Sequence, residues 1–533
     1  MLLKTERKIR GLALSAASLN GTAETSSAPP SKRQWLRFVT AASLFDGHDA
    51  AINIMRRILQ SSGAEVIHLA HNRSVQDIVE AAIQEDVDAI AISSYQGGHI
   101  EYFKYLVDRL RELGADHIKI FGGGGGVIIP AEIEELHNYG VSRIYSPNDG
   151  QAIGLQGMID DMLNRCRSGK SRPAAPDLTQ LGEGDRLILT RVITGIENEE
   201  YADQELQTLK QQASTRLNTP ILGITGTGGA GKSSSTDEII RRFRQDSSDS
   251  LKIAVLAIDP TRKKTGGALL GDRIRMNAIG HPNIFMRSVA TRDSSVEIPE
   301  RLSEIVAAIK VSGFDLIIIE TPGIGQGDAG IVPFVDTSLY VMTPEFGAAS
   351  QLEKIDMLDY ADVFAINKFD RKGSEDALRD VCKQVQRNRE AFTQMPDEMP
   401  VFGTIASKFN DDGITALYQA LVPLLRTHGL PDYEQAIAAI NVKKSTQTSL
   451  IIPAQQQRYL AEIAEIVRDY HEQVRTQSQL ARERQQLIAS KAMLDLDSKD
   501  SSVLDELIAA KDSAMDEKAK RLLDAWPQLK VDY

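Results

Sequence analysis

The sequence predicts an α/β protein with two successive parallel sheets and a helical C-terminal region. Strand and helix patterns alternate along residues 34–169, which is typical of a doubly wound, flavodoxin-like sheet. A further apolar strand at Ile221 runs into the glycine-rich motif G-x-x-x-x-G-K-S of residues 226–233, which predicts a P-loop domain over residues 170–430. Residues 455–496 contain few helix breakers and many Arg, Glu and Gln residues, and residues 503–529 repeat that character, which predicts a helical region over residues 431–533.

Composition limits the classes of partner. The 533 residues, 42% of them hydrophobic, are enough for several domains, each with its own core. A net charge of −12 supplies no basic field for nucleic acid, and no apolar run is long enough for a membrane span. The two cysteines, Cys166 and Cys382, lie far apart and indicate a reducing compartment. We therefore predict a cytoplasmic protein without nucleic-acid or membrane partners.

The first 33 residues differ from the rest of the chain. A short basic start is followed by small and polar residues as far as Pro30. The segment Gly11–Leu19 is too serine-rich and too weakly apolar for a typical signal peptide. We interpret residues 1–33 as a flexible N-terminal tail, and a targeting peptide remains the alternative.

Hydrophobic periodicity assigns five strands and four helices to the first domain. The strands are short apolar runs, and the helices repeat their apolar residues with a period near 3.6. The expected strands are residues 37–42, 65–69, 89–93, 117–121 and 142–146, and the expected helices are residues 49–62, 74–85, 100–113 and 131–138. Ligands of such sheets bind outside the carboxyl ends of the strands, so the loops at those ends are the candidate binding site.

Three of these loops resemble those of the cobalamin-binding domain in the coenzyme-B12-dependent mutases. Asp46-x-His48 resembles the start of the D-x-H-x-x-G motif, with Ala51 in place of its glycine. Ser93 and Tyr95 resemble S-x-L with tyrosine for leucine, and the loop beginning at Gly125 and Gly126 resembles G-G-x-I-P with one extra residue.

The resemblance implies a role for each of these residues. His48 would be the lower axial ligand of cobalt, and Asp46 would hold the other ring nitrogen of His48. The remaining cofactor contacts would be Ser93, Tyr95, Gly125 and Gly126. A corrinoid methyltransferase module would share the same loops and stays open as an alternative.

The P-loop residues are expected to hold phosphate. Glycines let successive backbone N–H groups face the phosphate oxygens, the lysine adds a positive charge, and the following hydroxyl ligates Mg²⁺. The expected nucleotide-binding residues here are Gly228, Gly229, Ala230, Gly231, Lys232, Ser233 and Ser234.

Three acids near the ends of later strands are candidate Mg²⁺ ligands. Asp259 follows strand 253–258, Glu320 follows strand 315–319, and Asp272 lies in a glycine-opened segment between them. A hard cation needs oxygen ligands close to the phosphates, so we group these acids with Ser233. For Asp272, a helix cap or a turn is the alternative.

The motif N-K-x-D after the strand beginning at Phe364 predicts guanine as the base. Asp370 can accept hydrogen bonds from two guanine N–H donors, and adenine has no equivalent pair. Asn367, Lys368 and Ser407 complete the expected base site. The strand-end motif opens with Glu320, and Ile324 stands where small GTPases have their water-orienting glutamine, with Gln326 two residues later. We therefore expect slow intrinsic hydrolysis.

Residues 223–276, 320–326 and 367–370 together resemble the G-protein chaperones of the methylmalonyl-CoA mutase type. That resemblance adds Thr321 as an Mg²⁺ contact and Arg275 as a nucleotide contact, and it gives Lys232 and Glu320 catalytic roles. A cobalamin domain followed by such a GTPase resembles the N-terminal part of the fused isobutyryl-CoA mutase family.

This family resemblance implies adenosylcobalamin, GTP and Mg²⁺ as cofactors. It also implies radical interconversion of isobutyryl-CoA and n-butyryl-CoA, GTP-gated cofactor loading, a mutase barrel as partner and a homodimer in the full enzyme. The chain has no room for that barrel after its GTPase, so we expect no isomerisation by the chain alone.

Two alternatives remain open. The first is that the chain is a free-standing GTP-dependent cobalamin carrier rather than part of a mutase. The second concerns residues 455–496 and 503–529, whose helices would form either a solvated linker or an arm that docks the GTPase onto the mutase.

Overall fold

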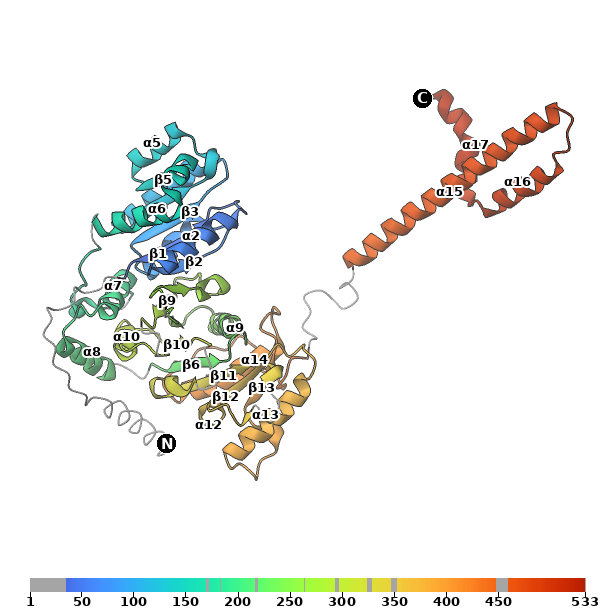
Figure 1. Cartoon of the computed structure of the whole chain (residues 1–533). Coiled ribbons are helices and arrows are strands. Elements are labelled where there is room, and N and C mark those ends of the chain that lie inside the picture. The colour runs from blue at the N-terminus through green and yellow to red at the C-terminus, as the bar shows by residue number, and fades with distance from the viewer. Residues whose placement is uncertain are drawn as a thin grey trace. The chain divides into compact units, whose positions relative to one another are not determined.

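The computed structural model describes residues 35–168, 172–182, 184–215, 219–262, 264–292, 297–323, 328–346, 352–446 and 459–532. The chain separates into two compact units between Gln447 and Thr448 (Figure 1). The tail predicted for residues 1–33 lies outside the described residues. We call residues 35–168 the N-terminal domain and residues 172–446 the P-loop domain.

The N-terminal domain is built on a parallel sheet with the order β5-β4-β3-β1-β2, which confirms the predicted doubly wound fold. Apolar residues such as Val39 and Ile90 are fully buried in it, as expected for strands covered on both faces. The strands are β1 Arg37–Ala42, β2 Glu65–His68, β3 Ala89–Ser93, β4 Lys119–Gly123 and β5 Arg143–Tyr145, and the helices between them are α2 Asp49–Ser61, α3 Val75–Gln84, α4 His99–Glu112 and α5 Pro130–Tyr139.

Two features of this domain differ from the sequence-based prediction. Strand β4 begins at Lys119 rather than at residue 117, because the backbone first closes a turn from Ile118 N–H to Ala115. A further helix, α6 Pro147–Ser168, follows β5, and Ile159 and Met162 bury against the sheet. Gly154 interrupts this helix with a φ of 66°, so its apolar residues do not keep one helical period.

The P-loop domain has a seven-stranded parallel sheet with the order β13-β12-β11-β6-β10-β7-β9. Its strands are β6 Ile221–Gly226, β7 Ile253–Asp259, β9 Ile284–Ala290, β10 Leu316–Glu320, β11 Thr337–Met342, β12 Val363–Asn367 and β13 Val401–Thr404. The main helices are α7 Arg186–Glu197, α8 Asp203–Thr215, α9 Lys232–Asp246, α10 Leu302–Val311, α12 Met357–Tyr360, α13 Ser374–Asn388 and α14 Asp412–Arg426. Two apolar cores contain residues from opposite faces of the sheet, with Leu222 and Val255 in one and Ile317 and Leu256 in the other.

One short strand of the P-loop domain belongs to the sheet of the N-terminal domain. Strand β8, Ala268–Leu270, pairs in parallel with β2, so the first sheet has six strands in the order β5-β4-β3-β1-β2-β8. Sequence reasoning treated the two domains as separate sheets, because a run of three apolar residues between glycines is too short to show a strand period.

The compact part of the chain extends past the predicted boundary between residues 430 and 431. Tyr433, Ile437, Ile440 and Val442 pack against the core of the P-loop domain, and the N–H of Ile437 donates to Asp246 at 2.7 Å. This stretch has no helix, so no periodicity pointed to its burial. The division between the two units lies instead after Gln447.

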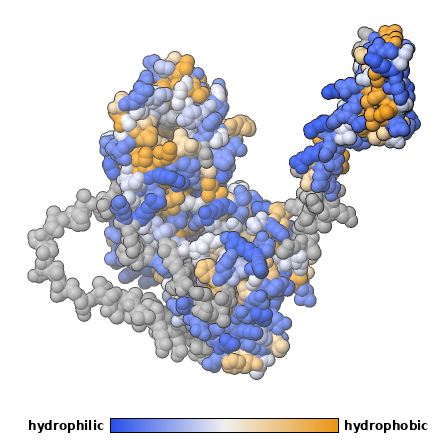
Figure 2. Space-filling model, turned by 45° about the vertical axis from the view of Figure 1, so that its right-hand side comes forward, coloured by the Kyte–Doolittle hydropathy of each residue, from blue (hydrophilic) through white to orange (hydrophobic). Residues whose placement is uncertain are grey.

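The C-terminal unit is helical, as predicted, with α15 Tyr459–Leu496, α16 Ser502–Ala514 and α17 Glu517–Asp532. Helix α16 packs along α15 through ion pairs such as Arg484–Asp512 at 2.5 Å and Lys511–Glu483 at 2.6 Å. Many apolar side chains in this unit stay exposed, and Figure 2 shows hydrophobic residues at its surface. Within the described residues, no helix combines the length and apolar character that a bilayer span needs.

Candidate functional site

The P-loop connects β6 to α9 and is shaped by glycines. Gly231, directly before the helix, has a φ of +92°, a conformation that favours glycine. A Cβ at this position would lie 2.4 Å from the side-chain nitrogen of Asn367. The loop therefore needs glycine at Gly231 to bring the guanine motif against its backbone.

Lys232 is the first residue of α9 and is 8% exposed. Its Nζ lies 2.9 Å from the carbonyl oxygen of Gly226 and 3.4 Å from that of Thr227. The ammonium group thus lies over the P-loop, within the same turn of chain that would receive a phosphate.

Ser233 connects the P-loop to two of the predicted acids. Its Oγ lies 3.0 Å from Asp272 Oδ1 and 2.7 Å from Glu320 Oε1. The third acid, Asp259, accepts from the N–H of Gly271 at 3.2 Å. The structure therefore brings together the hydroxyl and the acids that sequence analysis grouped as Mg²⁺ ligands.

The acids repel one another in this arrangement. Burial, together with the neighbouring Asp272 carboxylate, raises the pKa of Glu320 to about 8. Burial, together with the Asp272 and Glu320 carboxylates, raises the pKa of Asp259 well above its ordinary value. Crowded carboxylates with raised pKa values are the setting that a bound cation would relieve.

The oxygen donors of this cluster fit Mg²⁺. Among the described residues, no group of three His, Cys, Asp or Glu side chains forms a complete metal cage. Mg²⁺ does not require one, because it usually takes one or two protein carboxylates and completes its shell with water and substrate phosphates. The hydroxyl of Ser233 and the carboxylates beside it meet that requirement.

The resemblance also implied Thr321 as an Mg²⁺ contact and Arg275 as a nucleotide contact, and neither side chain hydrogen-bonds to Ser233 or to the three acids. The hydroxyl of Thr321 donates to the hydroxyl of Thr225 at 2.8 Å, and the backbone N–H of Thr321 donates to the carbonyl oxygen of Ile224. Arg275 is exposed, and its side chain makes no hydrogen bond or ion pair with the described residues. Ile324 and Gln326 lie outside the described residues.

Two residues of the N-K-x-D motif, Asn367 and Lys368, bind the backbone of the P-loop, and the third, Asp370, can still bind a nucleotide base. Asn367 donates from Nδ2 to Ala230 O at 2.8 Å and accepts from Ala406 N–H at 3.0 Å. Lys368 Nζ donates to Gly229 O at 2.7 Å. Asp370 is exposed and has no hydrogen-bond partner among the described residues. Ser407 follows Ala406 and is also exposed.

At the carboxyl end of β1, Asp46 fixes the orientation of His48. Asp46 Oδ1 lies 2.8 Å from His48 Nδ1 and accepts the His48 backbone N–H at 2.9 Å, while Oδ2 accepts the N–H of Tyr95 at 2.6 Å. Burial raises the pKa of the Asp46 carboxyl, but the hydrogen bonds from Tyr95 and His48 more than offset it, so the net pKa is lowered. Asp46 is therefore a carboxylate at neutral pH and can accept the Nδ1 proton of His48.

His48 is positioned to offer its other nitrogen. Its side chain is 75% exposed, and its ring centroid lies 5.4 Å from that of Tyr95. With Nδ1 bonded to Asp46, Nε2 is the nitrogen that can face a ligand.

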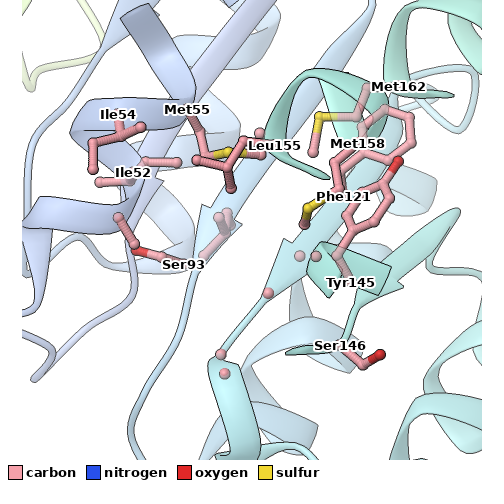
Figure 3. A pocket seen from close by; sticks show the side chains of 18 of the residues that line it. Ile52, Ile54, Met55, Ser93, Phe121, Tyr145, Ser146, Leu155, Met158 and Met162 are labelled. Atoms are coloured by element: carbon pink, nitrogen blue, oxygen red, sulfur yellow. The ribbon is translucent and has the colours of Figure 1, made fainter. Parts of the chain in front are cut away.

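A cavity of about 340 Å³ opens between the sheet, α2 and α6, and Figure 3 shows the side chains that line it. Most of them are apolar. Ser93 also lines the cavity, and its Oγ is buried without a hydrogen-bond partner among the described residues. An unsatisfied buried hydroxyl in an apolar cavity points to a polar ligand group. The cavity, this hydroxyl and the exposed His48 fit a cofactor with a long tail, such as cobalamin.

Glycines keep one wall of the cavity open. A Cβ on Gly124 would lie 2.0 Å from the carbonyl oxygen of Ser94, and one on Gly125, whose φ is +57°, would lie 3.0 Å from the Tyr95 ring. Gly125 and Tyr95 both line the cavity, whereas Gly126 does not.

Sequence analysis missed most of the cavity wall. The missed residues come from α2, the strand ends and α6, and they include Met55, Phe121, Tyr145, Met158 and Met162 (Figure 3). The spacing of Met158 and Met162 was the available signal, because residues four apart share one face of a helix. Such a pattern is equally typical of an ordinary core, so it did not single out a site.

Comparison with known proteins assigns both domains. Residues 36–148 match the model of the B12 binding domain, and residues 189–511 match that of the methylmalonyl-CoA mutase-associated GTPase MeaB. Fused isobutyryl-CoA mutases are similar to this chain, with identities of 60% for Cupriavidus metallidurans, 54% for Nocardia farcinica and 52% for Geobacillus kaustophilus. Each similarity covers 93% of this chain and 46% of the relative.

The chain thus spans less than half the length of these relatives. The matched models agree with the structure, since a doubly wound sheet with a strand-end histidine precedes a P-loop sheet with the N-K-x-D motif. The predicted cobalamin-binding and GTPase domains are confirmed. The chain belongs to the family of methylmalonyl-CoA mutase-associated GTPases, the MeaB family, and carries a B12-binding domain ahead of its GTPase.

Proposed function

We propose that this chain is the cofactor-loading part of an adenosylcobalamin-dependent acyl-CoA mutase, in which Mg²⁺–GTP binding and hydrolysis gate the loading of cobalamin. The observation that carries the proposal is the presence of both sites in one compact unit, joined by a shared sheet. A GTPase that shares a sheet with the cofactor domain is suited to respond to that domain or to act on it.

In the nucleotide site, we assign a role to each residue from its contacts or from its place in the motif. The backbone of Gly228–Gly231 holds the phosphates, together with Lys232 and Ser234, and Lys232 stabilises the negative charge that develops on the transferred group. Ser233, Asp259, Asp272 and Glu320 would hold Mg²⁺ directly or through water. Asp370 and Ser407 bind the guanine, while Asn367 and Lys368 hold the loop.

In the cofactor site, His48 would bind cobalt through Nε2, and Asp46 would keep the proton on Nδ1. Ser93, Tyr95 and Gly125 line the cavity that receives the cofactor tail. When bound, adenosylcobalamin supplies the radical chemistry of a carbon-skeleton rearrangement. The residues of this chain hold and orient the cofactor and leave substrate binding to another domain.

The similarity to fused isobutyryl-CoA mutases supports the choice of substrate and partner. The substrate pair is isobutyryl-CoA and n-butyryl-CoA, and the partner is a mutase barrel of about 250 residues. In the complete enzyme we propose a homodimer. A free-standing cobalamin carrier, the alternative, would need no barrel.

An isomerisation assay tests this assignment. The chain mixed with adenosylcobalamin and isobutyryl-CoA is expected to give no n-butyryl-CoA, because nothing in the described residues encloses an acyl-CoA beside the cofactor. Adding the barrel of a fused isobutyryl-CoA mutase should restore turnover, measured by chromatography of the acyl-CoA products. Turnover by the chain alone would contradict the proposed division of roles, and no gain with the barrel would favour the carrier.

A single substitution tests the guanine assignment. Asp370→Asn replaces an acceptor by an amide that also donates, so GTP affinity is expected to fall by about 10- to 100-fold, the value of one or two hydrogen bonds to a charged group. Xanthosine nucleotides, whose base offers a carbonyl where guanine has its amino group, should bind better than GTP. Calorimetric titration of both nucleotides measures the change. Equal use of ATP and GTP by the unchanged chain would refute guanine specificity.

A further inference from the structure

The segment that carries Asp272 lies between two contacts with the N-terminal domain. On its N-terminal side, Ala268, Leu269 and Leu270 pair in register with Glu65, Val66 and Ile67 of β2. The N–H of Ala268 also donates to the carbonyl oxygen of Ala64 at 3.2 Å. The chain enters the metal-ligand cluster directly from the sheet of the cobalamin-binding domain.

On the C-terminal side, Arg273 is bound by the last turn of α3. Its Nη2 donates to Gln84 Oε1 at 2.6 Å, and its Nε lies 3.3 Å from Glu85 Oε1. Arg273 is 8% exposed and Glu85 is fully buried. Removing one partner of such a pair leaves an uncompensated buried charge, which is strongly unfavourable.

Gln84 and Glu85 also bind the edge of the P-loop sheet. Gln84 Oε1 accepts from the N–H of Met286 at 3.2 Å, and Glu85 Oε2 accepts from the N–H of Ser288 at 3.0 Å. Both N–H groups belong to β9, which forms one edge of the seven-stranded sheet. The end of α3 is thus fixed to the P-loop sheet independently of Arg273.

Little free chain remains between these contacts. Only Gly271 and Asp272 separate the end of β8 from Arg273, and a residue spans at most about 3.6 Å. Asp272 Oδ1 lies 3.0 Å from Ser233 Oγ. A displacement of Asp272 by several ångströms would have to break the pairing of β8 or the contacts of Arg273.

We propose that the cobalamin-binding domain completes the Mg²⁺ site of the GTPase. In this proposal β2, Gln84 and Glu85 are positioning elements that hold Asp272 beside Ser233, with Arg273 as the connection. The inference rests on the proposed function, in which Ser233 and Asp272 serve Mg²⁺–GTP. The position of Asp272 would then depend both on Mg²⁺–GTP and on the cobalamin-binding domain, and this dependence would couple the two sites.

The matched pair Arg273→Lys and Arg172→Lys tests the proposal. Both arginines lie in the P-loop domain and pair with a buried carboxylate of the N-terminal domain, Arg172 with Asp86 at 3.6 Å. Lysine keeps the charge but loses the planar fork of donors. Only Arg273 adjoins Asp272, so only Arg273→Lys should weaken the Mg²⁺ site.

The readout is the Mg²⁺ concentration that gives half-maximal retention of a fluorescent GDP analogue. Arg273→Lys is expected to raise it by about 10-fold or more, as for residues that orient metal ligands. Nucleotide affinity in EDTA should stay within about twofold of the unchanged chain, because the P-loop itself is intact. An unchanged Mg²⁺ requirement in Arg273→Lys, or an equal rise in Arg172→Lys, would overturn the proposal.

A second pair keeps the test decisive if Arg273→Lys does not fold. A Cβ on Gly267 would lie 2.1 Å from the carbonyl oxygen of Gln60, so Gly267→Ala pushes β8 away from its partner. Gly280 has nothing within 4 Å of an added Cβ, so Gly280→Ala is the control. Gly267→Ala should raise the Mg²⁺ requirement, and Gly280→Ala should not. Equal Mg²⁺ requirements would overturn the proposal, whereas a wild-type chain without Mg²⁺-dependent GTP binding would instead refute the proposed function.

Discussion

Replacing Lys232 with alanine is expected to abolish GTP turnover by this chain. The ammonium group lies over the P-loop, where it would contact the phosphates, and Lys232 is the only lysine in the motif of residues 226–233. Loss of one preorganised donor to a transferring phosphoryl group costs about 100- to 1000-fold in rate. Phosphate release under saturating GTP measures the turnover, and calorimetry measures the accompanying loss of affinity.

The control for this variant is Lys383→Ala. Lys383 is exposed on α13, and its side chain has no hydrogen bond or ion pair with the described residues, so its loss should change neither affinity nor rate. Thermal unfolding of both variants shows whether the Lys232 change acts on the site or on the fold. Turnover by Lys232→Ala within about threefold of the unchanged chain would rule out the assigned role.

Replacing His48 with alanine is expected to remove the protein ligand from cobalt and to weaken cobalamin binding. In the reduced-cobalt state, the electron paramagnetic resonance spectrum should lose the nitrogen hyperfine splitting of the imidazole. Asp46→Ala should leave a weaker ligand in place and reduce affinity by about 10- to 100-fold, as for a residue that orients a metal ligand. Because His48 is 75% exposed, its removal should leave the unfolding temperature unchanged.

His71→Ala is the matched control for the cobalt ligand. His71 is an exposed histidine of the same domain, outside the Asp46-x-His48 motif, and should not alter the spectrum. Labelling the protein with nitrogen-15 histidine identifies the source of the splitting. An unchanged spectrum in His48→Ala would refute His48 as the ligand.

Much of the fold could be predicted because local patterns decide it. The strands of the first domain alternate with helices of clear period, and their predicted ranges agree with β1, β2 and β3 within one residue. The P-loop and N-K-x-D residues were found because each motif carries its own local chemistry. Their mutual contact, from Asn367 Nδ2 to Ala230 O, was not predicted, because it depends on the strand order, in which only β11 lies between β12 and β6.

The remaining features depend on contacts that no local pattern contains. Strand β8 is only three residues long and is a strand because β2 offers an unfilled edge. In the sequence, Gln84 and Glu85 have the pattern of an ordinary helix end. Their role depends on contacts with β9 and Arg273, which only the folded structure shows. Likewise, the apolar cavity wall could not be told from core packing, because both use the same residues at the same spacing.

The placement of β8 has a consequence for how the protein is made. During synthesis, the five strands of the N-terminal domain leave the ribosome well before β8, so none of the described strands can pair with the outer side of β2 until the P-loop and α9 have also emerged. An open edge strand can pair with other chains and aggregate. Fragments that stop before residue 268 should therefore be less soluble than longer ones, and truncation experiments on the cofactor domain need to retain the P-loop domain.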